Sequence, residues 1–125
     1  MKPETLIFNK VRKIIPGKSD KTIFFVGITK TSQEVFFYSF INGEVVQCYT
    51  LAENYELDEN ELEEVFSEIV DIIKDSKLYI PEKYNVGTII VDKSGIKLNV
   101  VNYDMGVSEY KIQKQWKNEN INNLK

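Results

Sequence analysis

Residues 58–75 read DENELEEVFSEIVDIIKD, and this stretch decides the fold class of the chain. Its apolar residues recur every three or four positions, which is the period of a helix with one buried face. That face consists of Leu62, Val65, Phe66, Ile69, Val70, Ile72 and Ile73. Asp58 is placed to cap the helix, and Glu61 three positions later supplies the carboxylate of a capping box. A helix with so broad an apolar face must pack against another element.

The segments before this helix predict strands. Residues 22–28, TIFFVGI, are apolar at both odd and even positions, which is typical of a strand covered on both faces. Residues 34–41 predict a second strand, and Asn42-Gly43 follows it directly. This dipeptide indicates a hairpin, because a type I′ turn needs positive φ at two successive residues. We therefore expect residues 44–51 to return antiparallel as a third strand.

Two further strands and two further helices complete the expected order. Residues 86–91 and 96–101 flank the turn Lys93-Ser94-Gly95 and predict a second hairpin. A first helix is expected over residues 3–15. A last helix is expected from a cap at Ser108 to about Lys117, followed by a polar, frayed tail at 118–125. The sequence thus predicts one α+β domain over residues 1–125, in the order αβββαββα. Its long acidic helix packs on an antiparallel sheet of about five strands.

The composition removes most of the side chains from which catalytic and metal sites are built. The chain has no histidine, one cysteine and one arginine, so it cannot form a histidine triad, a histidine-containing zinc site or a cage of cysteines. We interpret Cys48 as a core residue, because no histidine is present to activate its thiol. Asp58–Glu61 lacks the glycine of a calcium-binding loop and is interpreted as helix capping. We therefore expect no enzymatic activity, no cofactor and no metal.

Acidic residues are concentrated around the long helix. Between Glu53 and Glu82 there are eleven acidic residues and two lysines, a local charge of −9 in a chain of net charge −3. Such a surface repels phosphates, so nucleic acid is not an expected partner. It would attract a cationic partner by long-range steering, although the same charges also fit a merely solvated face. No stretch has the length and apolar character of a membrane span or a signal segment, so we expect a cytoplasmic protein without membrane contact.

The order of these features resembles that of the YezG-like immunity family, bacterial antitoxins paired with secreted polymorphic toxins. The matching features lie within roughly residues 5–118. They are Ile15-Pro16 after the first helix, Glu34-Val35-Phe36-Phe37-Tyr38, the acidic helix from Asp58-Glu59-Asn60-Glu61-Leu62 to Ile73, Ser94-Gly95, Val101-Asn102-Tyr103-Asp104 and Gln115-Trp116-Lys117. The resemblance implies a non-enzymatic inhibitor that binds a toxin domain, commonly a nuclease, in the producing cell.

The charge pattern and the resemblance together predict the partner-binding residues. They are acidic residues of the long helix, with aromatic and acidic residues nearer the chain end: Glu59, Glu63, Glu64, Glu68, Asp71, Asp75, Tyr103, Asp104 and Trp116. The carboxylates would steer the toxin, and the aromatic rings would supply desolvated contact. The alternative is a small ligand-binding or regulatory α+β domain whose sheet cups an apolar molecule. A closed apolar cavity would favour that alternative. The sequence makes no prediction of the oligomeric state.

Overall fold

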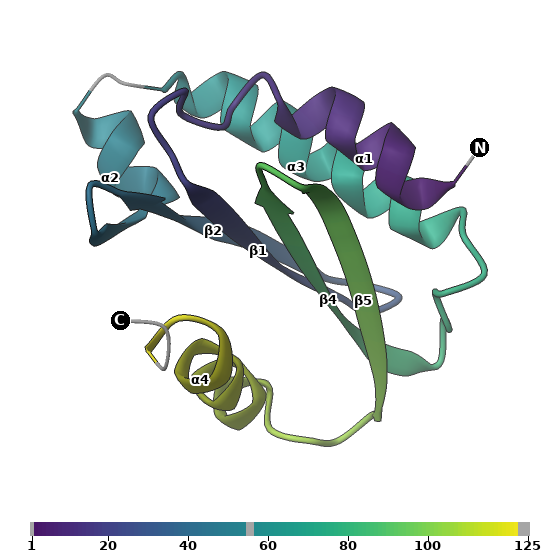
Figure 1. The fold of residues 1–125 in the computed structure, drawn as a ribbon. Coiled ribbons are helices and arrows are strands. Elements are labelled where there is room, and N and C mark those ends of the chain that lie inside the picture. The colour runs from purple at the N-terminus through teal and green to yellow at the C-terminus, as the bar shows by residue number, and fades with distance from the viewer. Residues whose placement is uncertain (1, 55–56, 123–125) are drawn as a thin grey trace.

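Helices cover both faces of a five-stranded sheet in the computed structural model, which describes residues 2–54 and 57–122 (Figure 1). The elements are, in chain order, α1 (Pro3–Val11), β1 (Lys21–Ile28), β2 (Gln33–Ile41), β3 (Glu44–Gln47), α2 (Cys48–Glu53), α3 (Glu59–Lys74), β4 (Lys83–Asp92), β5 (Gly95–Asp104) and α4 (Glu109–Asn120). The strand order is β3-β2-β1-β4-β5, and every neighbouring pair is antiparallel. The predicted α+β fold is confirmed, with one additional helix.

The central strand β1 is covered on both faces, as its uniformly apolar sequence predicted. Every residue from Thr22 to Ile28 is buried. Figure 1 shows α1 and α3 on one face of the sheet and α4 on the other. Phe24 and Val26 belong to the core under α1 and α3, whereas Ile23 and Phe25 belong to the core under α4. The two-residue period of the strand therefore divides its apolar side chains between two cores.

The long helix α3 buries the predicted face. Asp58 caps it, since its carboxylate accepts a hydrogen bond from the backbone N–H of Glu61 at 3.0 Å. Phe66 meets the rings of Phe24 and Phe37 edge-on, at centroid distances of 6.5 and 6.2 Å. The face is at most 6% exposed at Leu62, Val65, Phe66, Ile69, Val70 and Ile73, and it is half-buried at Ile72. The packing of this helix on the sheet was therefore predicted correctly.

Both hairpins form as predicted. Asn42 and Gly43 have φ angles of 52° and 79°, the two positive values that a type I′ turn requires. In the second hairpin Asp92 pairs with Gly95 across a two-residue turn. The strands of this hairpin are longer than the predicted ranges 86–91 and 96–101, because ladder pairing continues to Lys83 and Asp104.

The third strand is shorter than expected. It was predicted over residues 44–51, but it ends at Gln47, and the chain continues as the helix α2; this part of the prediction is wrong. The side-chain oxygen of Gln47 accepts a hydrogen bond from the backbone N–H of Tyr49 at 2.9 Å and caps α2. Cys48 and Leu51, three residues apart, are then both buried on one side of the helix.

The two terminal helices have different ends from those predicted. α1 stops at Val11 rather than near residue 15, but the next residues continue as turns that still bring Ile14 into the core. α4 is capped by Ser108 as predicted and runs to Asn120, beyond the expected end, and Ile121 is also buried. Residues 123–125 of the expected frayed tail lie outside the described residues. No helix formed by residues 2–54 or 57–122 combines the length and apolar character needed to cross a bilayer.

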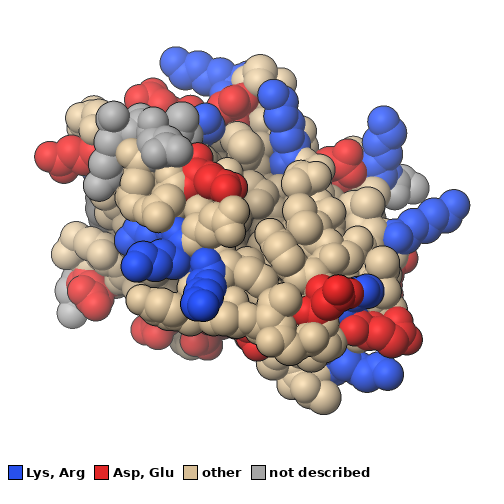
Figure 2. Space-filling model, turned by 90° about the horizontal axis from the view of Figure 1, so that it is seen from below, with Lys and Arg blue, Asp and Glu red and all other residues tan. Residues whose placement is uncertain are grey.

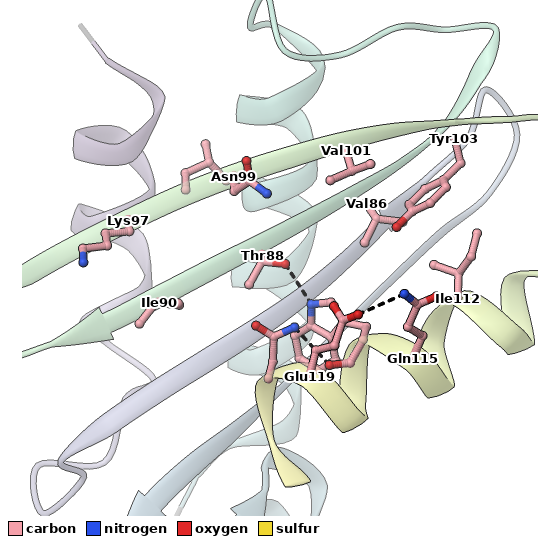
Figure 3. Close-up of a pocket in the computed structure, with 13 residues that line it drawn as sticks. Val86, Thr88, Ile90, Lys97, Asn99, Val101, Tyr103, Ile112, Gln115 and Glu119 are labelled. Carbon is pink, nitrogen blue, oxygen red and sulfur yellow. Dashed lines mark hydrogen bonds between the residues drawn. The ribbon is translucent and has the colours of Figure 1, made fainter. Parts of the chain in front are cut away.

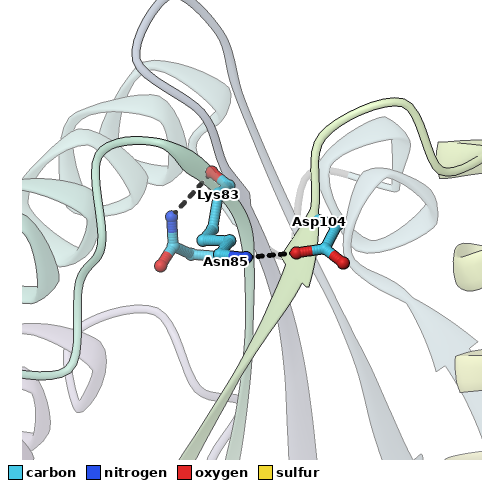
Figure 4. Close-up of polar contacts among 3 residues, drawn as sticks. All are labelled: Lys83, Asn85 and Asp104. Carbon is cyan, nitrogen blue, oxygen red and sulfur yellow. Dashed lines mark hydrogen bonds and ion pairs between the residues drawn. The ribbon is translucent and has the colours of Figure 1, made fainter.

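Asn85 joins the connection between α3 and β4 to the sheet. Its amide nitrogen donates to the backbone oxygens of Ile80 (2.9 Å), Lys83 (3.0 Å) and Ile28 (3.2 Å). Its amide oxygen accepts from the backbone N–H of Ile80 and from the Asn102 side chain. Figure 4 shows the bond to the Lys83 backbone beside the ion pair of the Lys83 side chain with Asp104. This buried amide therefore organises the end of the sheet where β4 begins and β5 ends.

Candidate functional site

The nine predicted partner-binding residues do not form one site. The six acidic residues from Glu59 to Asp75 lie on α3 or its C-cap, on the face of the sheet that α1 and α3 cover. Tyr103 and Trp116 belong to the core on the opposite face, under α4. Asp104 ends β5. The structure therefore separates the prediction into two surfaces, which we call the acidic face of α3 and the β5–α4 groove.

The acidic face of α3 consists of exposed carboxylates that have no ion-pair partner in the described part of the chain: Glu59, Glu61, Glu63, Glu64, Asp71 and Asp75. Glu68 differs, because it is half-buried and forms an ion pair with Lys10 of α1 at 2.6 Å. Within residues 2–54 and 57–122 no other carboxylate of α3 takes part in an ion pair. Glu68 thus ties α3 to α1 and is less available to a second protein than the carboxylates of the acidic face.

An exposed aromatic residue that was not among the predicted site residues lies beside the acidic face. Tyr49 of α2 shares a shallow hollow with Glu34 of β2 and Glu63 of α3. Burial raises the pKa of Tyr49, and the negative charges of Glu63, Glu59 and Glu34 are among the further causes. An aromatic ring next to carboxylates is a favourable environment for a lysine or arginine side chain. Tyr49 was predicted to lie in a strand, so its proximity to these carboxylates could not be predicted from the sequence.

The β5–α4 groove forms because α4 covers only part of its face of the sheet. Trp116 of α4 packs edge-on against Phe25 and Phe36, at centroid distances of 5.2 and 6.0 Å, and so holds α4 over β1 and β2. The outer strands are left with a groove of about 490 Å³ beside α4 (Figure 3). Its walls include Thr88, Lys97, Asn99, Val101 and Tyr103 from the sheet and Gln115 and Glu119 from α4.

The three predicted residues on this side have different environments. Trp116 is 6% exposed, and its indole N–H donates to the Thr88 hydroxyl at 2.8 Å, so it serves packing more than recognition. Tyr103 is half-buried at the groove wall. Asp104 is exposed, and the hydrogen bond and positive charge of Lys83 lower the pKa of its carboxyl group. Tyr103 is therefore the one aromatic residue of the prediction that a partner could contact directly in this groove.

A run of exposed apolar residues after the middle of β5 was not predicted from the sequence. Val101, Met105, Val107 and Tyr110 are 41%, 59%, 39% and 74% exposed. Figure 2 shows the α4 side of the molecule, where uncharged side chains fill the middle and charged ones lie mostly toward the margins. Exposed tyrosine and methionine are typical of protein interfaces. Their alternation with polar residues was visible in the sequence, but it did not show that one face of β5 stays uncovered.

A second groove, with a volume of about 600 Å³, lies beside β5 on the face of the sheet that α1 and α3 cover. Its apolar wall is formed by Leu6 of α1, Ile72 of α3, Leu78 of the connection after α3, and Leu98 of β5. Both grooves are open to solvent, whereas the alternative of a small-ligand protein would be favoured by an enclosed apolar cavity. Neither groove therefore gives that alternative specific support.

The described residues contain little that is arranged for chemistry. Cys48 is fully buried, and its burial raises the pKa of the thiol, so it is poorly placed to act as a nucleophile. Among the described residues, no group of three or more histidine, cysteine, aspartate or glutamate side chains is arranged to hold a metal ion.

No family model matches the sequence, and no curated protein matches it.

Proposed function

We propose that the chain is an immunity protein that binds a secreted bacterial toxin, most simply a nuclease, in the producing cell and blocks it without catalysis. The observation that supports this most is the acidic face of α3, whose exposed carboxylates have no ion-pair partner among the described residues. A nuclease must present positive charge to hold phosphates. The acidic face would be attracted to that same surface, so binding would exclude the nucleic acid.

The acidic face and its surroundings have complementary roles in this proposal. The carboxylates accelerate the encounter, because their field extends beyond contact distance at low ionic strength. Tyr49 provides an aromatic surface against which a lysine or arginine of the toxin can pack, between Glu34 and Glu63. The resemblance to YezG-like immunity proteins points to the same class of partner from the order of the sequence motifs.

The proposal is tested with the cognate toxin domain, which is sought first in the gene immediately upstream. The variant Glu63→Gln, Glu64→Gln, Asp71→Asn neutralises the acidic face and keeps the Glu68–Lys10 ion pair. We expect a slower association rate in stopped-flow mixing. The wild-type rate should fall between about 0.01 M and 0.15 M salt, because the Debye length shortens from about 30 Å to about 8 Å.

The matched control is Asp20→Asn, Glu44→Gln, Glu119→Gln, which removes the same number of exposed charges outside α3. The control should associate at nearly the wild-type rate. Co-expression of the chain should also restore growth to cells that produce the toxin domain. Equal association rates for all three proteins, without any response to salt, would show that the acidic face is only solvated surface. A failure to bind the toxin or to protect the cells would overturn the proposed function itself.

A further inference from the structure

The two edges of the sheet are unlike each other. On one edge, β3 has four residues, after which the chain turns into α2. On the other edge, β5 has ten residues and pairs with β4 in one continuous register, from Lys83 with Asp104 to Asp92 with Gly95, without a bulge. The outer side of β5 has no neighbouring strand in the described sheet. Alternate N–H and C=O groups along this side are therefore free to pair with another strand.

The usual protection of an edge strand is weak in β5. Natural edges are commonly short, bulged, or interrupted by proline and charged residues. β5 contains no proline, and Lys97 is the one charged residue between its ends. Apolar side chains flank the free edge on both faces of the sheet: Val101 is exposed toward the β5–α4 groove, and Leu98 lies with Leu6 and Leu78 in the second groove. Such an edge is a template for strand pairing.

We propose that β5 pairs antiparallel with β5 of a second copy of this chain, so that the two sheets join across a twofold axis. This inference does not depend on the proposed function. If the whole strand pairs, the twofold axis lies near Val100, the centre of β5. Residues that lie opposite each other across the axis then point to the same face of the joined sheet. Asn99 then lies opposite Val101 of the second copy, and Lys97 lies opposite Tyr103. The exposed apolar residues beside the edge become buried in both subunits.

The charges along β5 fit a second copy. With the axis at Val100 the two Lys97 residues are about six positions, or about 20 Å, apart, which exceeds the Debye length of about 8 Å at 0.15 M salt. Asp104 is already neutralised within its own chain by Lys83. The helix that packs against β5 is α1, whereas α3 packs against β2. Asp75 is the carboxylate of the acidic face that lines the second groove with Leu98. Self-pairing therefore brings together no uncompensated like charges along the strand.

The test is the oligomeric state of the full chain, measured by sedimentation velocity from about 1 µM to about 300 µM. Wild-type protein should shift from monomer to dimer over this range. The variant Asn99→Lys, Val101→Lys changes two exposed residues that the proposed register places opposite each other, so lysines would meet on both sides of the axis. Like charges across a strand pair should raise the dimer dissociation constant by about tenfold or more.

The matched control is Thr31→Lys, Ser67→Lys, which adds two lysines at exposed positions away from β5. Both variants move the net charge of −3 toward zero, so general repulsion between copies decreases in each. The control should dimerise like the wild type, and amide hydrogen exchange of β5 should slow as wild-type concentration rises. A wild-type chain that remains monomeric throughout would overturn the proposal. A dimer that Asn99→Lys, Val101→Lys weakens no more than the control does would also overturn it.

Discussion

At the scale of single residues, Gly27 shows how closely the side chains of the core under α4 pack. Gly27 in β1 has no room for a side chain: a Cβ atom there would lie 3.0 Å from the Tyr84 hydroxyl oxygen and 3.1 Å from the ring of Phe25. We expect Gly27→Ala to lower the free energy of unfolding by about 1–3 kcal/mol, because these buried rings must shift. Urea denaturation monitored by circular dichroism measures this loss.

Gly87 on β4, which pairs with Val26, provides the matched control. A Cβ atom at Gly87 would approach Ile73 and Val26 at 3.5 Å, an ordinary contact distance. Gly87→Ala should therefore change stability much less than Gly27→Ala. Adding Tyr84→Phe to Gly27→Ala should recover part of the loss by removing the nearest oxygen. Equal losses for the two alanine variants would show that close packing around Gly27 does not limit the fold.

Tyr84 also makes stability depend on pH in the alkaline range. Burial, the largest cause, raises its pKa from 10.0 to about 12, and the charges of Glu109 and Glu34 act in the same direction. The folded state therefore keeps the phenolic proton to higher pH than the unfolded state. The stabilisation is fully present below about pH 10 and is lost as the pH rises from about 10 to about 12.

The variant Tyr84→Phe should lose less unfolding free energy than the wild type as the pH rises into the alkaline range. Unfolding free energies of the two proteins are compared at about pH 8 and about pH 11, on either side of the ordinary tyrosine pKa. Wild-type protein should lose more stability between these values than Tyr84→Phe. Tyr49 is present in both proteins and cancels in the comparison. A parallel decline in the two proteins would contradict the assignment of the high pKa to Tyr84.

At the scale of elements, α3 buries the broadest apolar face of the described helices, and Phe66 is its largest buried side chain. Its ring meets two phenylalanines of the sheet, Phe24 and Phe37, and is 6% exposed. Phe66→Ala should cost on the order of 3–5 kcal/mol in unfolding free energy, because it leaves a cavity among rings that cannot close around it. The neighbouring exposed Ser67→Ala is the control and should have little effect. A loss below about 1 kcal/mol for Phe66→Ala would mean that α3 packs through another face.

The elements that the sequence predicted well are those with strong local signals. The 3.6-residue period and the Asp58 cap defined α3, and Asn42-Gly43 defined the first hairpin, because each signal depends only on nearby residues. The helix α2 was missed, since an apolar run of four to eight residues fits a strand or a helix equally well. Its choice depends on the Gln47 cap and on which side chains reach the core. The Gln47 cap is a local contact with Tyr49, but glutamine is not among the residues that usually predict an N-cap. Which side chains reach the core is a tertiary effect that no local pattern reports.

At the scale of the whole molecule, the candidate surfaces depend on how faces are covered, which the sequence does not determine. The carboxylates of α3 could be predicted as exposed, because they lie opposite a clear apolar face. Trp116 was predicted as a partner contact, but an aromatic residue on an amphipathic helix can be core or contact, and in the structure it is core. The face of β5 beside α4 stays uncovered because α4 lies over β1 and β2. The position of α4 is set by contacts between residues far apart in the sequence.

The acidic face should also reduce the stability of the isolated molecule. Glu59 with Glu63, and Asp71 with Asp75, place like charges one helical turn apart, and none of these carboxylates has a cation partner among the described residues. Each such pair costs a few tenths of a kcal/mol at low salt. The variant Glu63→Gln, Glu64→Gln, Asp71→Asn should therefore be more stable than the wild type in urea denaturation at about 0.01 M salt. The gain should shrink at about 0.15 M salt as screening increases.

The control Asp20→Asn, Glu44→Gln, Glu119→Gln distinguishes local repulsion from net charge. It changes the net charge by the same amount but removes none of the crowded carboxylates of α3, so it should show little or no gain. The α3 variant could be both more stable than the wild type and slower to bind the toxin. This pair of results would mean that α3 keeps carboxylates that weaken the fold because they serve recognition. A loss of stability in the α3 variant would instead show that these carboxylates support the helix. The electrostatic explanation of the acidic face would then have to be abandoned.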